Sequence, residues 1–149
     1  MLTDALWYEL RNSVYTRQLK HAEDLLNANP SLFDLRNSIG ETVLHFLAVE
    51  NDIQGVEWLH DRGFSLDTKN RFGEPLVFEA ADFGHKELVL WLAHHGADFS
   101  VVDRKNRNIG EYLLGRACRD EEHRRRREEM VQFLMQNVSG ARESREPGP

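Results

Sequence analysis

One stretch of the sequence is written twice in succession, and this repeat constrains the fold more than any other feature. When residues 37–69 are laid over residues 70–102 without a gap, eight of the 33 positions are identical. The identical pairs are Asn37/Asn70, Gly40/Gly73, Glu41/Glu74, Ala48/Ala81, Val56/Val89, Trp58/Trp91, Leu59/Leu92 and Gly63/Gly96. A fixed period of this length is typical of stacked repeats, in which one supersecondary unit recurs along the chain.

Within each copy the apolar residues have helical spacing, in two short stripes. The stripes are Val43, Leu44, Leu47 and Ala48, then Ile53, Val56 and Leu59, and in the second copy Leu76, Val77, Ala80 and Ala81, then Leu88, Trp91 and Leu92. Asn51 and Gly84 separate the two helices, and Gly63 and Gly96 are expected to end the second helix in a left-handed conformation. Each unit is thus predicted to be a helical hairpin followed by an extended loop, with Trp58 and Trp91 in the core. Such hairpins must stack to bury their apolar faces.

The segments GETVLHFLAVEND and GEPLVFEAADFGHKELVLWLAHHGAD resemble ankyrin repeats, whose pattern is G-x-TPLH-x-AA-x-x-GH-x-x-VV-x-LL-x-x-GAD. The matching residues are Thr42, Leu44, His45 and Ala48 in the first copy, and Ala80, Ala81, Gly84, His85, Gly96, Ala97 and Asp98 in the second. The sequence departs from the pattern at several positions. Val43 replaces the proline, Pro75 falls on the threonine position, Phe78 replaces the histidine, and Asn51–Asp52 replaces Gly-His.

The resemblance implies an all-α ankyrin-repeat solenoid of about four units over residues 1–138. Residues 1–36 would form a degenerate N-terminal cap unit, and residues 103–138 an extended C-terminal unit. The second helix of that last unit is expected to resume at EEMVQFLMQN, displaced by nine residues that hold the charged run RDEEHRRRR. Residues 139–149 have the composition of a disordered tail.

The charged run permits two interpretations. Four consecutive arginines, Arg124 to Arg127, suggest a nuclear-localisation signal. We favour a solvated helix, because oppositely charged residues stand four apart at Glu121/Arg125, Glu122/Arg126, Arg124/Glu128 and Arg125/Glu129. As an elongated final helix, the run could also shield the end of the stack or serve as an appended contact site.

Composition predicts a soluble cytoplasmic chain. The formal net charge of −6 argues against nonspecific nucleic-acid binding, because phosphate binding requires a net basic face. The apolar runs are too short to span a bilayer, and the N-terminus lacks a basic segment followed by an apolar one, so we expect neither a membrane span nor a secretory signal. A single cysteine, Cys118, agrees with a reducing compartment.

We expect no catalytic residues, no metal site and no cofactor, so the chain is predicted not to be an enzyme. Among the seven histidines, His85 and His94 lie on one helix about 13 Å apart, too far to share an ion. The resemblance gives His45 a structural role, in hydrogen bonds to the loop backbone. No Gly-rich phosphate loop, GxSxG or HExxH motif is present. The enzymatic alternative would require the histidines and Cys118 to converge in a cleft.

Function in such an array falls to positions that the repeat does not use for packing. The resemblance places these at the loop tips and on the exposed side of the first helix of each unit, along a concave face. The partner-binding residues are therefore predicted to be Arg36, Ile39, Glu41, Glu50, Lys69, Arg71, Phe72, Glu74, Asp82, Phe83, Arg104, Lys105 and Arg107. An aromatic flanked by arginines is typical of an interface hot spot. The alternative for Ile39 and Phe72 is packing on neighbouring loops.

Taken together, these features predict a non-catalytic protein–protein interaction module that is a monomer when free. It would act as an adaptor or as a stoichiometric inhibitor, a class that includes immunity proteins that neutralise bacterial toxins. A rigid surface of this kind loses little entropy on binding. The alternative is a structural or scaffolding subunit that self-associates.

Overall fold

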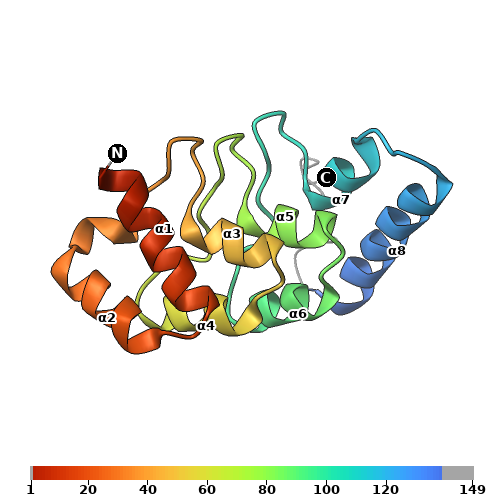
Figure 1. Cartoon of the computed structure of the whole chain (residues 1–149). Helices are drawn as coiled ribbons and strands as arrows, with labels where there is room; N and C mark the ends of the chain where they lie inside the picture. The colour runs from red at the N-terminus through yellow and green to blue at the C-terminus, as the bar shows by residue number, and fades with distance from the viewer. Residues whose placement is uncertain (1, 139–149) are drawn as a thin grey trace, which may run out of the picture. The chain divides into compact units, whose positions relative to one another are not determined.

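The computed structural model describes residues 2–138, with side chains from residue 4 onward, and the predicted disordered tail lies outside this range. Within it the chain forms eight α-helices, one 3-10 turn and two isolated β-bridges, and no extended strand (Figure 1). The elements are α1 (Leu2–Tyr15), α2 (Leu19–Ala28), η1 (Pro30–Phe33), α3 (Val43–Val49), α4 (Ile53–Asp61), α5 (Leu76–Asp82), α6 (Lys86–His94), α7 (Ile109–Gly115) and α8 (Glu121–Asn137). The predicted all-α class is confirmed. The chain divides into two compact units between Leu66 and Asp67.

The first unit is built around α1, the longest helix of the predicted N-terminal cap. α1 packs against α2, α3 and α4, and α3 pairs with α4. Its buried face carries Trp7, Leu10 and Val14, which are at most 2% exposed. Burial of large side chains of this kind stabilises a unit by about 1.5–3 kcal/mol each.

The second unit consists of two helical hairpins, α5–α6 and α7–α8. α5 packs against α7, and α6 packs against α8. The buried side chains that hold the hairpins together are Leu76, Val77, Phe78, Leu88, Leu92, Tyr112, Leu113, Met130 and Leu134. Phe78 and Tyr112 bring their rings to a centroid distance of 4.8 Å, so a side chain from each hairpin contributes to the same core.

The first helix of each hairpin begins with a different cap. Thr42 caps α3 by accepting a hydrogen bond from the His45 backbone N–H at 3.0 Å, and its Oγ1 lies 2.8 Å from His45 Nδ1. Pro75 makes no side-chain cap at α5, and Phe78 fills the histidine position as a fully buried core residue. α7 starts with a capping box between Asn108 and Glu111. The helix therefore starts at the equivalent position in each hairpin, although only the first hairpin keeps the threonine and histidine of the TPLH pattern.

The turns follow the sequence prediction. Asn51 and Gly84 adopt positive φ angles of 57° and 76° between the paired helices. Gly63 and Gly96 do the same after α4 and α6, at 104° and 85°. The predicted left-handed helix ends are therefore confirmed.

One sequence prediction about packing was wrong. Trp58 and Trp91 are half-buried rather than core residues. The Arg62 guanidinium lies 3.8 Å from the Trp58 ring centroid, and the His95 ring stacks on Trp91 at 3.9 Å. The last helix begins at Glu121, before the expected resumption at Glu128, and residues 121–127 form its first two turns, as the favoured helical interpretation of the charged run predicts.

Candidate functional site

Three loops in the chain are fingers of one design, and each precedes the first helix of a hairpin (Figure 1). At the base of each finger one side-chain oxygen accepts two backbone hydrogen bonds from residues two and four positions later. Asn37 accepts from Ile39 and Glu41 at 3.1 and 2.9 Å, Asn70 from Phe72 and Glu74 at 2.9 Å each, and Asp103 from Lys105 and Arg107 at 2.9 Å each. Such Asx turns fix the loop backbone without help from the tip side chain.

The finger turns require a left-handed residue. Gly40 and Gly73 have φ angles of 81° and 78°, and Asn106 takes the same role in the third finger at 60°. Antiparallel bridges close two of the fingers, between Arg36 and Thr42 and between Lys69 and Pro75. The fingers are therefore preorganised supports for whatever their tips present.

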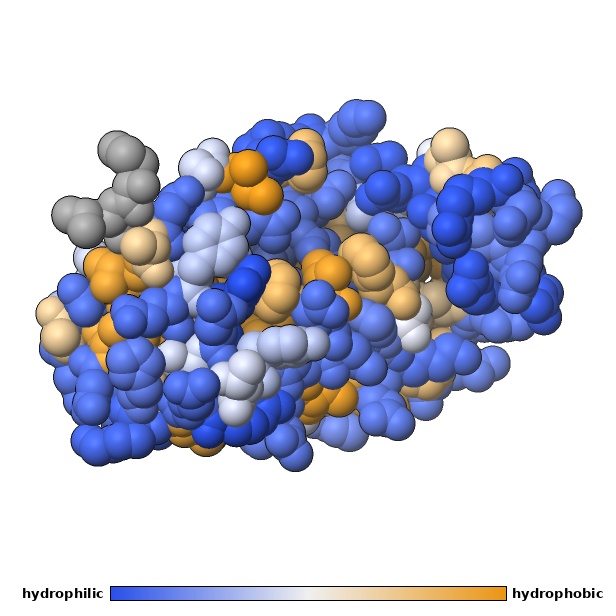
Figure 2. Space-filling model, viewed as in Figure 1, coloured by the Kyte–Doolittle hydropathy of each residue, from blue (hydrophilic) through white to orange (hydrophobic). Residues whose placement is uncertain are grey.

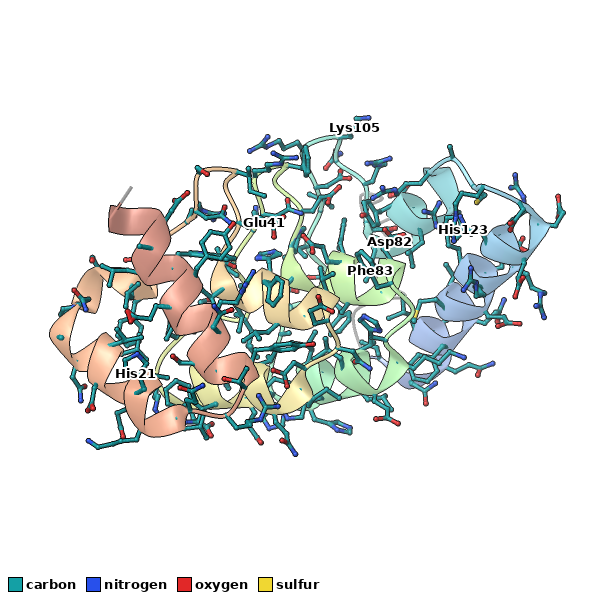
Figure 3. The ribbon with its side chains drawn as sticks, in the orientation of Figure 1. His21, Glu41, Asp82, Phe83, Lys105 and His123 are labelled. Carbon is teal, nitrogen blue, oxygen red and sulfur yellow. The ribbon has the colours of Figure 1, made fainter. Side chains whose placement is uncertain are left out.

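The tip residue, two positions after the Asx residue, is exposed in all three fingers. Ile39 is 51% exposed, Phe72 is 55% exposed, and Lys105 also points into solvent (Figure 3). Neither apolar tip is packed away, in contrast to the alternative considered from sequence.

In the second unit the tips form a mixed aromatic and basic surface. The Arg71 guanidinium lies 4.5 Å from the Phe72 ring centroid. Arg104, from the third finger, lies across Gly73, where a Cβ atom would meet its side chain at 2.5–2.9 Å. The structure thus brings together Arg71, Phe72 and Arg104, three of the predicted binding residues.

The third finger carries a buried ion pair. The Asp103 side chain is 3% exposed and accepts from Arg107 Nε at 2.8 Å as well as from the two backbone N–H groups. Desolvation opposes its charged form, but the hydrogen bonds from the Arg107 backbone and side chain and from Lys105 outweigh it and hold the Asp103 pKa below its ordinary value.

Several of the predicted binding residues have internal partners. Glu74 accepts from Asn70 Nδ2 at 3.0 Å, Arg107 pairs with Asp103, and Arg36 donates to the Gly40 carbonyl at 3.0 Å. Asp82 is 15% exposed at the side chain and pairs with Arg127 and Arg116 at 3.2 and 3.6 Å. Glu41 is half-buried, whereas the exposed members of the set are Ile39, Glu50, Lys69, Arg71, Phe72, Phe83, Arg104 and Lys105, with Arg36.

Sequence reasoning missed a cleft of about 370 Å³ between the C-terminal end of α5 and the start of α8. Its lining residues are Ala81, Asp82, Phe83, Gly84, Arg119, His123, Arg126 and Arg127. Figure 3 shows Asp82 and Phe83 on one side and His123 on the other. Figure 2 shows the surface hollowed between an apolar patch beside α5 and the hydrophilic side chains around α8.

Arg127 fixes one wall of this cleft. Its side chain is 6% exposed, and its Nη1 donates to the carbonyls of Arg116 and Ala117 at 3.1 Å each. The predicted solvated helix is therefore wrong at this residue. Of the four ion pairs predicted along the run, one forms among the described residues, between Arg125 and Glu129 at 3.7 Å.

Cys118 does not form a nucleophile pair with His123 in the described residues. Its Sγ donates to the Arg116 carbonyl at 3.7 Å and lies 3.6 Å from Arg127 Nη1, whereas His123 Nδ1 accepts from the Arg119 backbone N–H at 3.2 Å. The described part of the chain holds no cluster of three or more histidine, cysteine or acidic side chains with the geometry of a metal site. No described helix is both long and apolar enough to cross a membrane.

Comparison with protein-family models gives two matches. Residues 11–103 match ankyrin repeats in a model of three copies, and residues 77–135 match ankyrin repeats in a model of many copies. The chain belongs to the ankyrin-repeat family. Ankyrin repeats are generally protein–protein interaction modules and are typically non-catalytic. The matches extend across the third finger and most of α8, so the charged C-terminal hairpin lies within an ankyrin repeat.

Proposed function

We propose that this ankyrin-repeat chain is a non-catalytic cytoplasmic module that binds a partner protein through its fingertips. It would act as an adaptor or a stoichiometric inhibitor, of which an immunity protein is one form. The observation that carries the proposal is Phe72, an aromatic side chain that is 55% exposed on a finger whose backbone Asn70 holds in place.

The surroundings of Phe72 support a role in recognition. A large exposed ring beside two guanidinium groups has the composition of an interface hot spot, in which aromatic and arginine side chains dominate. The rigid finger reduces the conformational entropy lost on binding. The same tip position in the first unit carries Ile39, also more than half exposed.

The proposal is tested by capture of the partner from a lysate of the source cells, followed by mass spectrometry. The variant Arg71→Glu/Phe72→Ala removes the mixed surface and should lose the captured protein by about tenfold or more, because hot-spot side chains contribute about 2 kcal/mol or more each. The control Glu87→Ala/His94→Ala alters two exposed residues of α6 and should capture as well as the wild type. Circular dichroism checks that both variants are folded.

Equal capture by the Arg71→Glu/Phe72→Ala variant and the wild type would contradict the fingertip site. Once a partner is identified, its activity with and without excess chain separates the two roles. An inhibitor abolishes that activity at a one-to-one ratio, whereas an adaptor leaves it unchanged.

A further inference from the structure

The cleft between α5 and α8 has an excess of positive charge in a chain whose net charge is −6. Three arginines, Arg119, Arg126 and Arg127, line it against one aspartate, Asp82. That aspartate is already matched, by Arg127 at 3.2 Å and by Arg116 at 3.6 Å. The charges of Arg119 and Arg126 are therefore left to face the cleft.

Both Arg119 and Arg126 are exposed, and neither takes part in an ion pair with another described residue. The Glu122–Arg126 pair that the sequence spacing predicts does not form within the helix. Both arginines interact electrostatically with Asp120, whose side chain accepts a hydrogen bond from the His123 backbone N–H at 2.8 Å as the cap of α8. Two guanidinium groups thus remain available to an incoming acceptor.

The opposite wall of the cleft carries an exposed aromatic ring beside Asp82. Phe83 is 55% exposed and stacks on the His85 ring at a centroid distance of 5.9 Å, so its ring is held flat beside the cavity. A ligand that fits this site combines anionic groups with an apolar side chain. An extended phosphate backbone does not match, because the basic groups are confined to one cleft of an acidic chain.

The walls are fixed before any ligand arrives. Arg127 joins the start of α8 to Asp82 at the end of α5 and to the carbonyls before the helix. A cleft of about 370 Å³ lies in the size range of sites that accept a few side chains. The guanidinium groups of Arg119 and Arg126, exposed beside this fixed wall, can bind carboxylates by charge-assisted hydrogen bonds.

We propose that this cleft binds an acidic peptide segment of a partner protein, with carboxylates on Arg119 and Arg126 and an apolar side chain against Phe83. The inference deepens the proposed protein-binding function by assigning it a second contact site and the chemistry of the partner. It requires no contact with the fingertips.

His123 provides a spectroscopic reporter within the cleft. Its pKa is lowered by desolvation and by the charges of Arg127, Arg119 and Arg126, and Asp82 partly offsets this. A bound carboxylate would favour the imidazolium form, so the His123 pKa should rise on binding.

The test is fluorescence anisotropy with a labelled decapeptide that holds four glutamates around one leucine. The wild type should bind this peptide, and Arg119→Gln/Arg126→Gln should weaken binding by about tenfold or more, because each lost charge-assisted contact is worth about a factor of ten. The matched control Arg124→Gln/Arg125→Gln removes the same charge from exposed positions of α8 that do not line the cleft. It should change the affinity by less than about twofold.

Four results would overturn the inference. One is the absence of binding by the glutamate peptide, and a second is equal loss of affinity in both arginine double variants, which indicates nonspecific attraction. The third is equal or tighter binding by a peptide with glutamines in place of glutamates, and the fourth is binding by a phosphoserine peptide alone. The His123 pKa can be measured by NMR with and without the peptide. A rise on peptide addition in the wild type, and no rise in Arg119→Gln/Arg126→Gln, supports the inference independently.

These measurements separate the two proposals. The Arg71→Glu/Phe72→Ala variant should bind the glutamate peptide as the wild type does, because its substitutions do not line the cleft. If that variant loses the native partner while no peptide binds, the cleft inference alone is wrong. If the peptide binds the cleft while the fingertip variant captures its partner normally, the fingertip proposal is wrong.

Discussion

The side chain at the base of a finger is chemically complementary to the charged residues around it. Asp103 faces Arg107, whereas Asn70 donates its Nδ2 to Glu74 and to the buried Glu79. An aspartate at residue 70 would place a third carboxylate among two others and lose both of these donations. The shared function of the position, to accept two backbone hydrogen bonds, needs only an oxygen.

This difference makes Asp103→Asn informative. The amide oxygen should keep both backbone hydrogen bonds, as Asn70 does, while the charge pair with Arg107 is lost. We expect the free energy of unfolding at pH 7 to fall by about 1–2 kcal/mol, because a hydrogen bond to a charged group contributes about 1.5–3 kcal/mol and the partly exposed Arg107 is screened by solvent.

The pH dependence has a defined sign. The Asp103 pKa is lowered in the folded state, so its contribution is complete above the ordinary aspartate pKa of about 3.9 and is lost as pH falls through the folded-state value. Wild type and Asp103→Asn should therefore converge in stability at acid pH. Urea unfolding at pH 7 and near pH 3 measures this, and an equal difference at both pH values would show that the charge is not responsible.

At the scale of the elements, the sequence predicts α3 to α6 well because each has apolar residues at helical spacing and a left-handed residue at its end. The apolar pattern of the last helix starts only at Glu128, since residues 119–127 carry no apolar period; the charge spacing predicts a helix there, and α8 begins at Glu121 with a cap at Asp120. The burial of Arg127 depends on Asp82, a residue of another hairpin, and spacing along the helix cannot reveal a tertiary partner. The cleft was missed for the same reason.

The sequence predicted that the fingertips are exposed, because the repeat assigns the packing positions to other residues. It could not tell which charged members of the predicted site are used internally. Asp82 and Arg107 look like surface residues in sequence, but their partners Arg127 and Asp103 bury them in part. The helical spacing of Trp58 and Trp91 predicted core positions and could not show that both side chains are only half-buried.

The attachment of α8 to α5 is tested by comparing Arg127→Met with Arg126→Met. Arg127→Met should lower the free energy of unfolding by about 2–4 kcal/mol, because it removes one of the two ion pairs of the half-buried Asp82 carboxylate and leaves two carbonyls without their donor. Arg126→Met, one residue away and exposed, should change it by less than about 0.5 kcal/mol. Equal effects in urea unfolding would mean that Arg127 is not an anchor.

At the scale of the whole molecule, the competing role is that of a self-associating scaffold. Leu114 on α7 and Met135 on α8 are 53% and 43% exposed, and these apolar side chains, outside both proposed binding surfaces, favour that role. Isolated exposed apolar residues are common on monomers, and a net charge of −6 opposes association of identical chains.

We therefore expect a monomer of 17.3 kDa by multi-angle light scattering at neutral pH. Measurements over a range of protein concentrations and at low and high salt give the mass under conditions that would favour either outcome. A discrete dimer or larger species that persists on dilution would favour the scaffold, and Leu114→Glu/Met135→Glu should then dissociate it. A constant monomer mass favours the binding module.

The fingers have a further consequence for how such a chain can change. Their backbones are held from the base by Asn37, Asn70 and Asp103, which accept hydrogen bonds from the backbone N–H groups of Ile39, Phe72 and Lys105, while the side chains of these tip residues take no part in those bonds. Substitutions at the tips are thus uncoupled from folding, and three such different side chains already occupy one backbone geometry. Selection, or a combinatorial library, could exchange the specificity of this protein at these positions without first having to restore its stability.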